Sequence, residues 1–101
     1  MTKLKRRFLF YNRKYFGGQL DPDTKVTWSR KLRGAYADCE DSEPLEIRIH
    51  IEWKPYWDVW NWNLLHEMAH LATPQEKSHH GPRWLRLMRS LVRRGAFDKI
   101  F

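Results

Sequence analysis

The chain of 101 residues carries a formal net charge of +7, and 31% of its residues are charged and 15% aromatic. This length fits one domain spanning residues 1–101, and the aromatic content argues against intrinsic disorder. The single cysteine, Cys39, excludes an intramolecular disulfide or a four-cysteine zinc ribbon within the chain and favours a reducing compartment. The sequence shows no signal-peptide core and no apolar run of about 20 residues, so we expect a cytoplasmic protein that does not enter a membrane. We also expect a monomer.

The N-terminal segment has the pattern of an amphipathic helix over residues 3–16. Its apolar residues recur at intervals of four, three and four and form one stripe: Leu4, Phe8, Tyr11 and Tyr15. Gly17-Gly18 is expected to end this helix, because glycine readily adopts the left-handed conformation that follows many helices.

Three short stretches downstream have the composition or the alternation of β-strands: residues 25–29, 34–39 and 45–52. The third is the clearest, because its apolar residues Leu45, Ile47, Ile49 and Ile51 alternate with polar ones. Strands in series with turn residues between them predict a three-stranded antiparallel sheet.

Two further helices complete a predicted α+β fold with an N-terminal helix, a central helix and a C-terminal helix. The central helix, residues 56–72, is apolar on most sides and is therefore expected at the centre of the domain. The C-terminal helix begins at Pro82 and ends at Arg94 before Gly95. One of its arcs is apolar: Trp84, Leu85, Leu87, Met88, Leu91 and Val92. The other is basic: Arg83, Arg86, Arg89, Arg93 and Arg94.

The central helix also carries the motif His66-Glu67-Met68-Ala69-His70, which matches H-E-x-x-H. Residues four apart lie one helical turn apart on the same face, so both imidazoles can reach one metal ion. Glu67 flanks that position and can hold a water molecule without binding the metal. The pattern predicts a metal site with Glu67 as the catalytic base.

A catalytic zinc site normally has three protein ligands and an open fourth position. The metzincin pattern would place Gly at position 73 and His at position 76, where this chain has Thr73 and Glu76. The C-terminal helix contains no carboxylate that could serve instead. The histidines His79 and His80, just before that helix, are the remaining candidates for the third ligand.

The motifs together resemble the SprT-like (Spartan) metallopeptidases. The resemblance covers about residues 11–88 and rests on three stretches: Tyr11-Asn12 to Leu20 with Val26 to Ser29, Leu64-Leu65-His66-Glu67-Met68-Ala69-His70, and His80-Gly81-Pro82-Arg83-Trp84. It implies a zincin-like fold, Zn²⁺ bound by His66, His70 and His80, and Glu67 as the general base. His80 rather than His79 occupies the position of the family's H-G pair.

The implied activity is hydrolysis of a protein or peptide by a water molecule that zinc activates and Glu67 deprotonates. Tyr36, His79 and Arg83 are candidates for stabilising the oxyanion, and an exposed edge at residues 45–52 could bind an extended peptide. Two alternatives stay open: a nucleic-acid-binding module whose structural zinc takes His79 or His50 as a fourth ligand, and a hydrolase that acts on another bond.

The arginine arc predicts a further partner. No acidic residue lies between Arg83 and Arg94, whereas a merely solvated face more often mixes charges of both signs. We expect weak, sequence-independent DNA binding that falls with salt; the alternative is a basic surface that only aids solubility.

Overall fold

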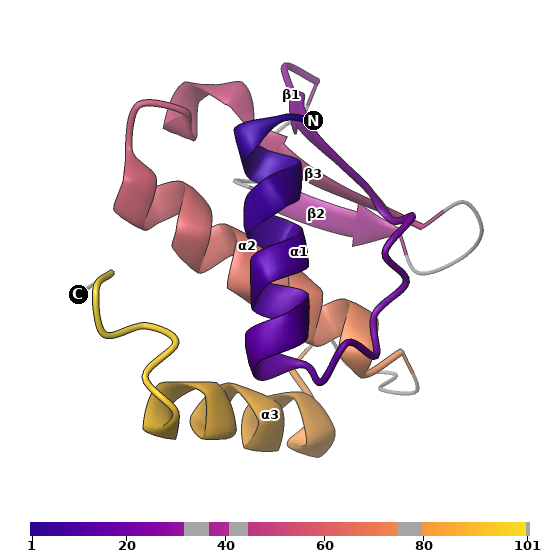
Figure 1. Cartoon of the computed structure of the whole chain (residues 1–101), viewed down its shortest axis with the longest axis vertical. Helices are drawn as coiled ribbons and strands as arrows, with labels where there is room; N and C mark the ends of the chain where they lie inside the picture. The colour runs from indigo at the N-terminus through magenta and orange to yellow at the C-terminus, as the bar shows by residue number, and fades with distance from the viewer. Residues whose placement is uncertain (32–36, 41–44, 75–79, 101) are drawn as a thin grey trace.

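The structure is a computed structural model, and it describes residues 1–31, 37–40, 45–74 and 80–100 (Figure 1). It has the predicted α+β composition. In chain order the elements are α1 (Lys3–Tyr15), β1 (Lys25–Ser29), β2 (Ala37–Glu40), β3 (Glu46–His50), a short 3-10 helix η1 (Ile51–Trp53), α2 (Trp57–Ala72) and α3 (Pro82–Arg93). The predicted residues 34–36 of the second strand lie outside the described residues. No helix in the described part of the chain is both long and apolar enough to cross a membrane.

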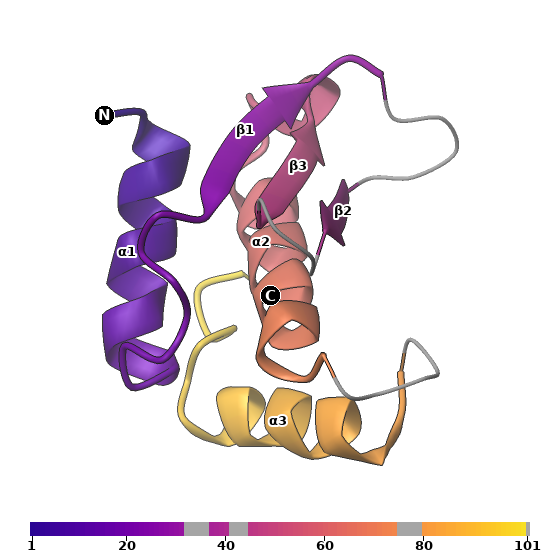
Figure 2. The same ribbon diagram turned by 90° about the vertical axis from the view of Figure 1, so that its right-hand side faces the viewer.

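The sheet is mixed, so the prediction of an antiparallel sheet was wrong. The strand order is β1-β3-β2, with β3 parallel to β1 and antiparallel to β2 (Figure 2). A parallel pair needs a long crossover connection, which here is the segment 30–45 with β2 inside it. β3 takes the central position, and its apolar residues Ile47 and Ile49 have no exposed surface.

α1 buries the stripe that the sequence predicted. Leu4, Phe8 and Tyr11 are at most 2% exposed, and Tyr15 is 8% exposed. The helix is tied to α2 by Asn61, whose side-chain oxygen accepts hydrogen bonds from the Tyr11 hydroxyl at 2.6 Å and from Arg7 Nε at 3.0 Å. These bonds fix α2 against the N-terminal helix.

α2 is the central helix, as expected from its composition. It packs against β2 and β3 on one side and against α3 on the other, and Leu64, Leu65 and Met68 are completely buried. Because the strongly buried residues lie around most of its circumference, the helix cannot rotate without exposing apolar surface. Its rotation, and with it the direction of the two motif histidines, is therefore set by packing.

α3 lies across the C-terminal ends of α1 and α2 (Figure 1). Its apolar arc is only partly buried: Trp84 and Leu91 are buried, whereas Leu85 is 42% and Val92 58% exposed. The C-terminal tail returns onto the body, where Phe97 and Ile100 are buried in the core.

Candidate metal centre

His66 and His70 lie one turn apart on α2, and both rings contact the first turns of α3. Their ring centroids are 4.9 Å apart, and each ring lies against Trp84 of α3, at 5.0 and 5.3 Å. Both side chains are half-buried. The end of α2 and the start of α3 thus form a pocket wall around two imidazoles.

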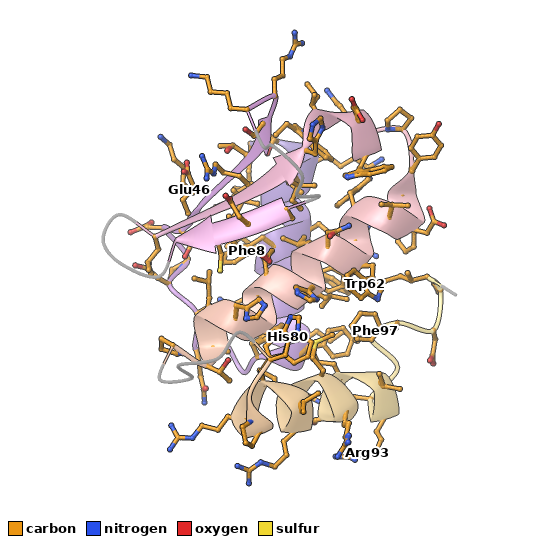
Figure 3. The ribbon with its side chains drawn as sticks, turned by 180° about the vertical axis from the view of Figure 1, so that it is seen from behind. Phe8, Glu46, Trp62, His80, Arg93 and Phe97 are labelled. Atoms are coloured by element: carbon orange, nitrogen blue, oxygen red, sulfur yellow. The ribbon has the colours of Figure 1, made fainter. Side chains whose placement is uncertain are left out.

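His80 completes a group of three. It directly precedes Gly81, the N-cap of α3, and Pro82, the first residue of that helix, and Figure 3 shows it between α2 and α3. Its Nε2 atom lies 3.3 Å from Nε2 of His66, which in turn lies 3.2 Å from Nε2 of His70. One ligand nitrogen from each residue falls within 4.8 Å of the others, so the three histidines predicted from the sequence converge.

The spacing fits a shared metal ion better than hydrogen bonds. A ring nitrogen carries either one hydrogen or one lone pair, so His66 Nε2 cannot bond well to both neighbouring nitrogens at once. Two nitrogens at about 2.0–2.1 Å from a tetrahedral ion lie roughly 3.3 Å apart, which is the observed separation. Imidazole donors suit zinc and other transition-metal ions.

His66 is held in the neutral form that a metal requires. Burial, together with the charges of the neighbouring His70 and His80, lowers its pKa from 6.5 to about 4. Its other ring nitrogen, Nδ1, is buried and has no hydrogen-bond partner among the described residues. At neutral pH the ring therefore offers a lone pair without first losing a proton.

Glu67 lies next to His66 on α2 but points into a more buried environment, where it is only 6% exposed. Burial, together with the negative charge of Asp38 on β2, raises the pKa of its carboxyl from 4.5 to about 7. Asp38 itself is paired with Arg48 of β3, whose Nε donates to it at 2.8 Å. A carboxyl with a pKa near neutrality can both accept and return a proton.

Two tryptophans build the walls of the site, and the sequence pattern did not assign them to it. Trp84 stacks on His80 with ring centroids 4.2 Å apart, and Trp62 lies 4.9 Å from His66. The available signal was their spacing: Trp62 precedes His66 by four residues on the same helix, and Trp84 follows His80 by four.

Other sequence candidates lie elsewhere. His50 is at the end of β3, where its Nδ1 accepts a hydrogen bond from the Glu52 backbone and caps η1; the described cluster does not include it. Arg83 is exposed on the first turn of α3. Tyr36 and His79 lie outside the described residues.

One of two comparisons with known proteins identifies a family for the chain. A comparison with curated protein sequences finds none that matches significantly. A sequence profile of the SprT-like family, by contrast, matches residues 4–98, which include all three helices, the sheet and the histidine cluster. The chain belongs to the SprT-like family.

Proposed function

We propose that the protein is a zinc-dependent metallopeptidase with a zincin-like arrangement of its active-site helix. The observation that carries the proposal is the convergence of three imidazole nitrogens within 4.8 Å of one another, beside the buried carboxyl of Glu67. Membership of the SprT-like family supports a metallopeptidase-like chemistry.

In this proposal His66, His70 and His80 hold the zinc ion. Bound zinc would polarise the carbonyl of the scissile bond and lower the pKa of a water molecule to about 7. Glu67 acts as the general base: its carboxylate accepts a proton from the attacking water and then donates it to the departing amine. The raised pKa of Glu67, about 7, suits both halves of this transfer.

The arrangement favours a catalytic over a structural zinc. A structural site is normally closed by four protein ligands, whereas the cluster among the described residues has three, and His80 is exposed. A site with three protein ligands, one of which is exposed, leaves room for water and substrate.

The substrate would lie along β2. The sequence placed an exposed sheet edge at residues 45–52, but β3 is paired on both sides and cannot be an edge. β2 is the edge strand that packs beside α2. An extended peptide can pair with such an edge through main-chain hydrogen bonds, which would carry it past the metal centre.

The deciding experiment compares the parent protein with Glu67→Gln after loading both with zinc. The parent should cleave an unstructured protein such as casein, and the variant should bind one zinc per chain but lose at least about 100-fold in activity. Zinc content is measured by atomic absorption. A zinc-loaded parent that cleaves no protein, with or without DNA, would favour the nucleic-acid-binding module.

We also propose weak DNA binding through α3. The arginines of its basic arc are all exposed: Arg83, Arg86, Arg89, Arg93 and Arg94. An exposed face of one sign can neutralise phosphates and release counterions, which would bring DNA-associated proteins near the metal centre.

A further inference from the structure

A second hollow borders the metal centre and has no role in the mechanism above. It has a volume of about 350 Å³ and is lined by Trp62 of α2, Met88 and Val92 of α3, and Phe97 and Asp98 of the tail. Four of the five lining side chains are apolar.

The hollow and the metal centre share one wall, the side chain of Trp62. The ring of Trp62 forms one wall of the hollow, and its centroid lies 4.9 Å from the ring of the metal-binding residue His66. An extended peptide advances about 3.3 Å per residue. A side chain that enters the hollow therefore belongs to a substrate residue next to the scissile peptide bond, or to the next residue along the peptide.

The lining decides which kind of side chain is favoured. In an apolar pocket one methylene changes the specificity constant by about 10-fold or more. An exposed ion pair, such as a substrate cation with Asp98, changes it by a factor of about 5 at most. Asp98 is exposed and is followed directly by Lys99, whose charge opposes a cation. The apolar lining therefore affects the specificity constant more than the charge of Asp98 does.

We propose that this hollow is the side-chain subsite of the metal centre and selects a large apolar residue, such as leucine, methionine or phenylalanine, adjacent to the scissile bond or one position away. The inference rests on the proposed peptidase function. It explains why Val92 is 58% exposed on α3: in the absence of substrate nothing covers this end of the apolar arc.

Val92→Asp tests the subsite, and Leu85→Asp is its matched control. Both residues are exposed apolar positions on α3, seven residues apart and hence on the same side of the helix, but Leu85 does not line the hollow. Peptides that differ only by leucine or glycine at each position flanking the cleaved bond serve as substrates of the zinc-loaded full chain.

The parent should prefer leucine over glycine at one of these positions by at least about 10-fold in kcat/KM. Val92→Asp should remove this preference by lowering kcat/KM for the leucine peptide, whereas Leu85→Asp should retain it. Asp98→Asn should change the preference by less than about fivefold. A parent preference for lysine or arginine that disappears in Asp98→Asn would overturn the apolar assignment.

A binding measurement separates this proposal from the proposed function. N-acetyl-leucine amide should shift the NMR signals of the Trp62 indole and the Met88 methyl group, and N-acetyl-glycine amide should not. Shifts without hydrolysis of any peptide would support the subsite and refute the peptidase. Hydrolysis of both peptides at equal rates, with no shifts, would refute the subsite and support the peptidase.

Discussion

Replacing Glu67 with Gln should remove one pH-dependent contribution to the stability of the metal-free protein. The carboxyl of Glu67 has an ordinary pKa of 4.5, which burial and the charge of Asp38 raise to about 7 in the folded protein. The folded state therefore holds this proton more tightly than the unfolded state does. The contribution of this carboxyl to stability is therefore lost as the pH rises from 4.5 through about 7.

The size of the effect follows from the two pKa values. One pKa unit corresponds to about 1.4 kcal/mol, so the ionised carboxylate costs the fold roughly 3 kcal/mol, of which most develops between pH 5 and pH 8. Gln has nearly the same shape and no charge. Relative to the parent, Glu67→Gln should therefore be more stable at pH 8 than at pH 5 by roughly 2–3 kcal/mol in the free energy of unfolding.

The assay is urea unfolding followed by tryptophan fluorescence, with a chelator present, for parent and variant at both pH values. His66, whose pKa is lowered to about 4, makes its own contribution in the opposite direction: stability rises as the pH rises from 4 to 6.5. Both proteins contain His66, so the difference between them isolates Glu67. A difference that is the same at pH 5 and pH 8 would refute the account of Glu67 as a buried carboxyl with a raised pKa.

Three further predictions concern the metal, the core and the charge. His80→Ala should lose stoichiometric zinc in atomic absorption, whereas His50→Ala, outside the cluster, should keep it; full zinc in His80→Ala would exclude His80 as a ligand. Phe8→Ala removes a completely buried ring and should lower the free energy of unfolding by about 3–5 kcal/mol in urea titrations, and a loss under about 1 kcal/mol would contradict its place in the core. Replacing the exposed arginines Arg86, Arg89 and Arg93 with glutamate should weaken binding to labelled DNA and flatten its salt dependence without changing zinc content. Unchanged binding would mean that the basic arc only faces solvent.

Local spacing made several features predictable from the sequence. The stripe of α1 repeats every three or four residues, and Leu4, Phe8, Tyr11 and Tyr15 are all buried. His66 and His70 are four apart on a helix, so their convergence follows from helical geometry alone. The prediction of His80 as the third ligand rested on a loop short enough to return to α2 and on the resemblance to a family.

The tertiary structure decided what depends on partners distant in the chain. The order β1-β3-β2 could not be predicted, because alternation within a strand shows which face is buried but not which strand lies beside it. Nor could the helical wheel of α3 show that Leu85 and Val92 stay exposed, since a wheel contains no information on how far the facing surface extends. The environment of the site is non-local too: Asp38 reaches Glu67 from β2, and Trp84 reaches His66 from α3. Spacing along one helix determined which histidines can meet, while packing between helices and the sheet determined how deeply Glu67 is buried and what surrounds the metal centre.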